Sequence, residues 1–121
     1  MALSKLHWGR VIAGGLLAEL GVFAVVFPVR HFFGQQAFLA SILAASAALP
    51  FVFAVWVGRR VKSDFILHGV LVGAVAALLY IILAWGQPQP LLYKIAHGLK
   101  LVGGLLGGII AERRAPARPL T

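Results

Sequence analysis

The chain has 121 residues, of which 61% are hydrophobic and only 12% are charged. Soluble globular domains carry roughly a quarter charged residues, so this chain lacks about half of the charge that usually solvates a protein surface. The length allows one domain, and we expect its surface to face a lipid bilayer. The chain contains no cysteine, which excludes disulfides, zinc–thiolate sites and thiol nucleophiles.

The net charge of +8 raises the question of nucleic-acid binding. The basic residues, however, form short clusters at the ends of apolar runs and make up no separate basic domain. Such clusters are typical of membrane proteins that follow the positive-inside rule. We therefore expect the lipid bilayer, and no nucleic acid, as the partner of these charges.

Four apolar runs are long enough to cross a bilayer core of about 30 Å, which takes about 20 helical residues. They lack the alternation of a transmembrane barrel. The connections VRHFFGQQ, GRRVKSD and GQPQP are short, so successive helices must be antiparallel. The sequence predicts an all-α membrane protein, an antiparallel four-helix bundle, with a transmembrane domain at 1–111 and a polar cytoplasmic tail at 112–121. The expected spans are 11–29, 37–57, 65–85 and 91–111.

Lys and Arg are distributed unequally between the two ends of the predicted bundle. Only Arg30 and Lys94 lie at the end away from the termini, and Lys100 lies inside a span. The positive-inside rule then places both termini in the cytoplasm, in what we expect to be a bacterial inner membrane. The residues that set this orientation are Lys5, Arg10, Arg59, Arg60, Lys62, Arg113, Arg114 and Arg118.

A faint internal repeat relates the two halves of the chain. HWGRVIAGGLLAEL and LHGVLVGAVAALLY open the first and third runs with similar small-residue patterns. The second and fourth runs each end in a pair of arginines. These similarities suggest a duplicated helical hairpin.

Small residues at helical spacing predict where the helices pack. In lipid no hydrophobic force draws helices together, so packing depends on residues that let two backbones approach closely. We expect the four glycines of the fourth run on one face, and Ala40, Ala44 and Ala48 on the inner face of the second run. The pattern does not separate contacts within the chain from contacts with a partner. The other packing positions are Gly14, Ala18 and Gly21, then Gly69 and Gly73, then Gly103, Gly104, Gly107 and Gly108.

Two ionisable residues interrupt the apolar runs, Glu19 in the first and Lys100 in the fourth. Counted from Arg10, Glu19 lies roughly 13 Å into the membrane at about 1.5 Å per residue. Counted from Arg113, Lys100 lies roughly 20 Å from the same face. The two long side chains can span this difference. We therefore expect the first and fourth helices to pack together around a Glu19–Lys100 ion pair.

Three interpretations of these charges stay open. In the first, the pair only fixes helix register and orientation. In the second, it is a proton or substrate site, as intramembrane ionisable residues often are. In the third there is no pair, and Lys100 extends towards an interface or a partner subunit. His97, one turn from Lys100, and the deeply placed Tyr80 complete the candidate polar site.

The four histidines lie near the ends of the apolar runs, with His7 and His68 at the cytoplasmic end and His31 and His97 at the other. Two pairs on opposite faces are similar to the bis-histidine haem sites of membrane cytochromes. Interfacial histidine is the simpler interpretation. The sequence has no phosphate-binding glycine motif and no catalytic constellation. We expect neither an enzyme nor a bound metal or cofactor.

Two stretches resemble a known family. FVFAVWVGRRVKSDFILHGVLVGAVAALLYIILAW and KLVGGLLGGIIAERR are similar to small four-helix bacterial membrane proteins of unknown function. Those proteins have a Gly-Arg-rich cytoplasmic loop, a Gly-xxx-Gly third helix and a Gly-Gly-rich fourth helix. The resemblance implies the architecture and assigns no activity.

A second, local resemblance concerns AGGLLAELGV, which is similar to the first helix of small multidrug resistance transporters. In that family the glutamate exchanges protons for cationic substrates, which would be the role of Glu19. The aromatic-rich third helix of the family is absent here, and Lys100 would disfavour a cationic substrate.

These observations lead to two expected functions. The first is a non-enzymatic accessory or interaction subunit, present as a homo-oligomer or in a larger membrane complex. The alternative is a proton-coupled small-molecule transporter that uses Glu19. A transporter needs a cavity that reaches Glu19, whereas a structural subunit buries this residue against Lys100.

Overall fold

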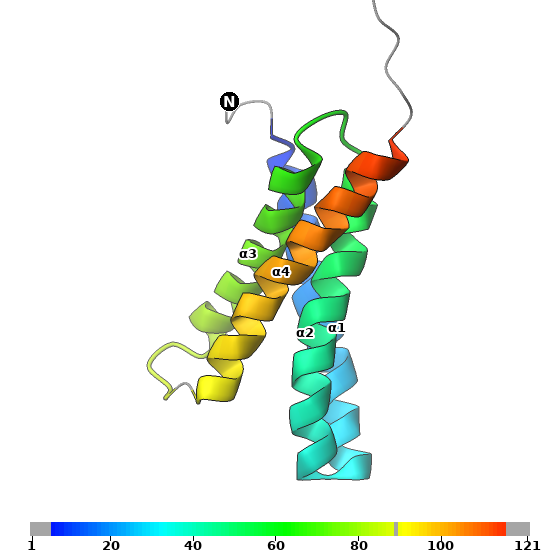
Figure 1. Cartoon of the computed structure of the whole chain (residues 1–121). Helices are drawn as coiled ribbons and strands as arrows, with labels where there is room; N and C mark the ends of the chain where they lie inside the picture. The colour runs from blue at the N-terminus through cyan, green and yellow to red at the C-terminus, as the bar shows by residue number, and fades with distance from the viewer. Residues whose placement is uncertain (1–5, 89, 116–121) are drawn as a thin grey trace, which may run out of the picture.

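The computed structural model describes residues 6–88 and 90–115, and over these ranges the chain forms four α-helices (Figure 1). Each helix is long and apolar enough to cross a membrane, which confirms the predicted all-α architecture with four candidate spans. Lys5, Arg118 and most of the predicted tail lie outside the described residues. The helices are α1 (Trp8–Phe33), α2 (Gln35–Gly58), α3 (Phe65–Leu83) and α4 (Leu91–Arg114).

The connection between α1 and α2 is much shorter than the sequence predicts. Both helices extend into VRHFFGQQ, and only Gly34 separates them. Gly34 has a φ of 89°, a conformation that glycine adopts without the steric cost of a side chain. A single residue can therefore reverse the chain at this point.

The last helix is longer than predicted. α4 continues to Arg114, so the first three residues of the segment predicted as a tail, Glu112–Arg114, are helical. In α2 the helix also continues through Pro50, whose side chain is buried.

The two hairpins, α1–α2 and α3–α4, are closest at one end of the bundle. This end carries the start of α1, the connection between α2 and α3, and the end of α4 (Figure 1). The hairpin turns lie at the opposite end, where Figure 1 shows the two hairpins diverging. The bundle thus has a compact end, with both ends of the described chain, and an open end.

The glycines of α4 divide between two neighbouring helices, so the expectation of a single packing face is wrong. Gly104 and Gly108 face α3, where a Cβ on either would meet backbone atoms of the residues around Gly69 and Phe65. Gly103 and Gly107 face α2, where a Cβ would meet the carbonyl oxygens of Ala47 and Phe51. Adjacent glycines lie about 100° apart around a helix, so each pair serves a different partner. All four are used within the chain.

The predicted packing face of α2 is also wrong. Ala40, Ala44 and Ala48 are exposed on the outside of the bundle. The inner face of α2 instead carries Ile42, Ala45, Ser46, Pro50 and Ala54. Nearly every residue of this helix is apolar, so small-residue spacing alone did not identify the buried face.

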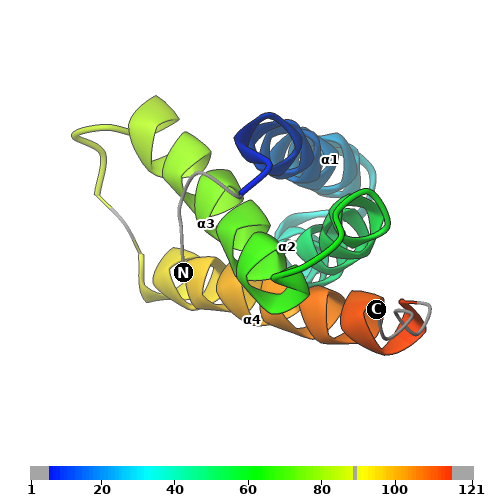
Figure 2. The same ribbon diagram turned by 90° about the horizontal axis from the view of Figure 1, so that it is seen from above.

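The first and fourth helices do not pack together as predicted. α2 and α3 each contact both α1 and α4, whereas in the described chain no Cα of α1 comes within 8 Å of a Cα of α4. Seen from above, α1 and α4 lie on opposite sides of the bundle (Figure 2). The reason is that the small residues of α4 face α2 and α3, so that α4 packs against these two helices instead of α1.

We predict that Gly104→Ala destabilises the bundle and that Gly98→Ala does not. A Cβ at Gly104 would meet the backbone of Gly69, which cannot rotate away, and such overpacking costs about 1–3 kcal/mol. A Cβ at Gly98, on the same helix, would meet nothing within 4 Å. Unfolding in mixed detergent micelles measures both changes, and equal stability of the two variants would contradict this packing.

Candidate functional site

Glu19 and Lys100 lie in direct contact inside the bundle. The ammonium Nζ of Lys100 donates to Glu19 Oε2 at 2.7 Å and to Oε1 at 3.0 Å. Glu19 is 0% exposed and Lys100 is 2% exposed. The two charges therefore neutralise each other in the interior of the bundle.

The Lys100 side chain crosses the diagonal of the bundle to reach Glu19. The backbone of Lys100 lies against α3, where a Cβ on Gly73 would meet the Lys100 carbonyl oxygen. Glu19 lies on the buried face of α1 with Gly15 and Ala18. The methylene groups of the lysine side chain cover the distance between two helices whose backbones stay apart.

His97 and Tyr80 surround the lysine end of the pair. Lys100 Nζ lies 3.4 Å from His97 Nδ1 and 5.2 Å from the centre of the Tyr80 ring. An ammonium group only donates hydrogen bonds, so Nδ1 of His97 accepts, and a neutral His97 carries its proton on Nε2. The ring centres of Tyr80 and His97 are 5.1 Å apart. The structure thus brings all four residues of the candidate polar site together.

A cavity of about 150 Å³ extends from the ion pair towards the open end of the bundle. All four helices contribute to its lining. Near the α1–α2 turn it is lined by Arg30, whose guanidinium lies 5.2 Å from the centre of the Phe38 ring. Its polar lining residues are Glu19, Arg30, Ser46, Tyr80, Tyr93, His97 and Lys100.

Two polar atoms of this lining are buried and have no hydrogen-bond partner among the described residues, Ser46 Oγ and His97 Nε2. Ser46 was not predicted as a site residue. Its position four residues before Pro50 indicates a free backbone carbonyl, because proline has no N–H to donate to it, but it does not mark the Ser46 hydroxyl. Both residues line the cavity beside the neutralised ion pair.

His68 forms a second buried polar contact, at the compact end of the bundle. Its side chain is 1% exposed, although the sequence indicates an interfacial position. The ring Nδ1 lies 2.7 Å from the carbonyl oxygen of Asp64, and the backbone N–H of His7 donates to Nε2 at 3.1 Å. Because a carbonyl only accepts, Nδ1 carries the proton. Both ring nitrogens are then engaged, which leaves neither free to ligate haem iron.

The remaining histidines do not form a comparable cluster. His31 packs its ring edge-on against the neighbouring Phe32, and His97 belongs to the polar site. Within the described residues no three His, Asp or Glu side chains form a group that could hold a metal ion.

The predicted orientation residues that the structure describes gather at the compact end of the bundle. Of the described Lys and Arg residues, only Arg30 and Lys94 lie at the open end. At the compact end, Arg60 donates to the carbonyl oxygen of Trp56 at 3.0 Å and covers the indole ring of the same residue. The basic residues of the compact end are Arg10, Arg59, Arg60, Lys62, Arg113 and Arg114.

Comparisons of the chain with protein-family models, with curated proteins and with solved structures found no match.

We predict that Glu19→Gln and Lys100→Met each destabilise the bundle by about 3 kcal/mol, because each leaves one charge without its buried partner. The double variant, which removes both charges, loses less than the sum of the two. The measurement is a double-mutant cycle of unfolding in mixed micelles. Lys94→Met is the control, since Lys94 is exposed on the same helix.

The exchanged variant, Glu19→Lys with Lys100→Glu, restores a pair of opposite charges and is expected to recover part of the lost stability. Single variants as stable as the wild type, combined with a less stable exchanged variant, would show that the two residues do not stabilise each other.

We predict that His68→Ala releases the segment before α1 from the start of α3. The variant loses the acceptor of the His7 N–H and leaves a cavity in a buried position. Hydrogen exchange at the His7 amide should become faster, whereas His31→Ala, which changes an exposed histidine, should leave it unchanged. Unchanged exchange in His68→Ala would mean that this hydrogen bond does not hold the segment.

Proposed function

We propose that this protein is a non-enzymatic integral membrane protein that serves as an accessory or interaction subunit, as a homo-oligomer or within a larger complex. The observation that carries the proposal is the mutual burial of Glu19 and Lys100. A carboxylate held by two hydrogen bonds to an ammonium group has no free charge to offer to a cationic substrate. The pair fixes the position of α1 relative to α4 in the bundle.

The exposed apolar side chains support an interaction role for the outer surface of the bundle. The α4 glycines pack within the chain, so they leave the outward faces to large apolar side chains such as Leu20, Leu78 and Leu106. These faces contact lipid or the helices of a partner.

We also propose a bacterial inner-membrane location with both termini in the cytoplasm. The support is the excess of Lys and Arg at the compact end over Arg30 and Lys94 at the open end. The weak repeat between the two halves is consistent with a duplicated hairpin, because each half forms one helical hairpin.

A proton-coupled transporter is the second candidate, and the cavity favours it. The cavity is lined by Glu19 and Lys100 and by Ser46 and His97, whose Oγ and Nε2 atoms have no hydrogen-bond partner among the described residues. In this alternative, proton uptake by Glu19 would separate it from Lys100 and open the site to a small polar substrate. The glutamate would then act as it does in the transporters that AGGLLAELGV resembles.

Purification of the tagged full-length protein from its native membranes in a mild detergent tests the first proposal. We expect a discrete oligomer or a stoichiometric complex, identified by light scattering and mass spectrometry. The Glu19→Gln/Lys100→Gln variant should retain the same assembly, because it keeps the interior neutral and the surface unchanged. A monomer without a co-purifying membrane protein would contradict the proposal.

The wild type and the Glu19→Gln/Lys100→Gln variant also distinguish a transporter from a subunit, when each is reconstituted in vesicles that contain a pH-sensitive dye. A subunit without transport activity gives equal proton leak for wild type and variant under an imposed pH gradient. Proton flux that requires Glu19 would instead establish the second candidate.

A further inference from the structure

A basic pocket opens at the compact end of the bundle, apart from the Glu19–Lys100 site. Its volume is about 520 Å³, and it lies between the end of α2, the start of α3 and the end of α4. The floor is apolar and includes Val55 and Phe65. The charged residues of the lining are Arg59, Lys62 and Arg114.

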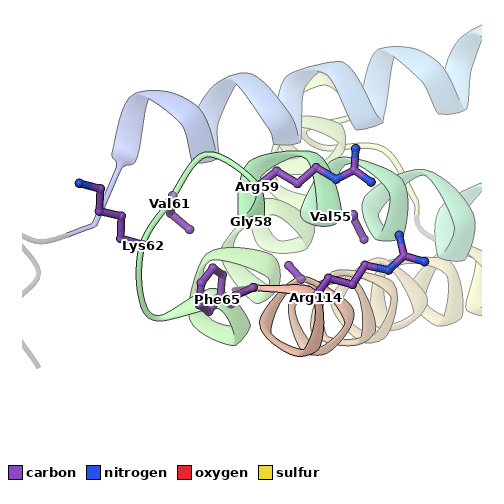
Figure 3. A pocket seen from close by; sticks show the side chains of 9 residues that line it. Val55, Gly58, Arg59, Val61, Lys62, Phe65 and Arg114 are labelled. Carbon is purple, nitrogen blue, oxygen red and sulfur yellow. The ribbon is translucent and has the colours of Figure 1, made fainter. Parts of the chain in front are cut away.

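Arg59 and Arg114 lie together on one side of this pocket. Figure 3 shows their side chains extending in the same direction past Val55, whereas Lys62 points the opposite way. Arg59 directly follows α2 and Arg114 ends α4, and the ends of these two helices approach closely where Gly58 lies against Ala111. Two planar donor groups on one side form a fork suited to phosphate oxygens.

An apolar groove of about 340 Å³ continues from the same two arginines along α2 and α4. Arg59, Arg114 and Val55 line both the pocket and the groove. The other lining residues of the groove are Phe51, Val52, Trp56 and Ile110, which belong to the membrane-spanning parts of the helices. The basic pocket is therefore continuous with the apolar groove on the outside of the bundle.

We propose that this surface binds one anionic phospholipid, with its phosphate between Arg59 and Arg114 and an acyl chain in the groove beside Val52 and Trp56. The order of the features matches such a lipid, with positive charge at the membrane surface and an apolar groove beneath it. Basic pockets between transmembrane helices are known to hold anionic lipid headgroups. The proposal requires only that the chain spans a membrane, and it does not depend on the role of Glu19.

Charge complementarity identifies the occupant as an anion rather than a zwitterion. Among the described residues, no carboxylate lines the pocket or the groove, so nothing there would bind the positive group of a zwitterionic headgroup. The neighbouring Arg60 is not part of this fork, because it is already held by Trp56. Arg113 lies next to Arg114 but lines neither feature.

Quenching of Trp56 fluorescence by lipids with brominated acyl chains tests the proposal. The full-length protein, with Trp8→Phe and Trp85→Phe so that Trp56 is the only indole, is reconstituted in phosphatidylcholine vesicles. Brominated phosphatidylglycerol or brominated phosphatidylcholine is then added in steps. We expect half-maximal quenching at a lower mole fraction of phosphatidylglycerol, by roughly fivefold for each arginine of the fork.

Two charge-matched variants separate a site from general attraction to a basic surface. Arg59→Gln/Arg114→Gln should abolish the preference for phosphatidylglycerol, and Arg10→Gln/Arg113→Gln should retain it at the same net charge. All four side chains are exposed, so both variants should fold, which circular dichroism checks. Loss of the preference in both variants, or in neither, would overturn the proposed site.

Two further measurements test the headgroup and the chain separately. Val52→Phe fills the groove without changing any charge, and it should weaken quenching by both brominated lipids. Glycerol phosphate at millimolar concentration should leave the quenching unchanged, because it lacks the acyl chain. Complete displacement by glycerol phosphate would show that the fork binds a soluble phosphate compound and would overturn the lipid proposal.

Discussion

Close contact of α4 with both α2 and α3 is the constraint on which the rest of the structure depends. In lipid, helices gain little from hiding apolar surface, so backbone proximity replaces the hydrophobic effect as the source of packing. Gly104 and Gly108 bring α4 against α3, and Gly103 and Gly107 bring it against α2. With both neighbours so close, α1 is left on the far side of the bundle.

The ion pair follows from that arrangement. Charges at the centre of a bilayer cost roughly 2.5–3.5 kcal/mol each on insertion scales, so the interior tolerates Glu19 and Lys100 only together. A shorter basic side chain on α4 would not cross the diagonal, and a lysine has the reach. The separation of the hairpins at the open end leaves the cavity beside the pair, whereas the compact end carries the basic pocket.

Several features of the fold escaped prediction for one physical reason. Hydrophobic periodicity identifies a buried face only where the exposed face is polar, and in lipid both faces are apolar. Ala40, Ala44 and Ala48 therefore have the spacing expected of a packing face, but they lie on the outside of the bundle. The division of the α4 glycines between α2 and α3 and the burial of His68 could not be predicted for the same reason. Each depends on which part of the chain packs against the residue, which the apolar pattern does not specify.

The sequence by itself determined the four apolar helices and their antiparallel order, because bilayer thickness and helix rise convert residue numbers into lengths. It also marked Arg59 and Arg114 as belonging to the same end. Only the tertiary structure decided that α1 and α4 are diagonal, so that the predicted Glu19–Lys100 pair crosses the bundle, and that Arg59 and Arg114 line one groove. Those outcomes depend on helix rotation and neighbour choice, which a uniformly apolar pattern does not encode.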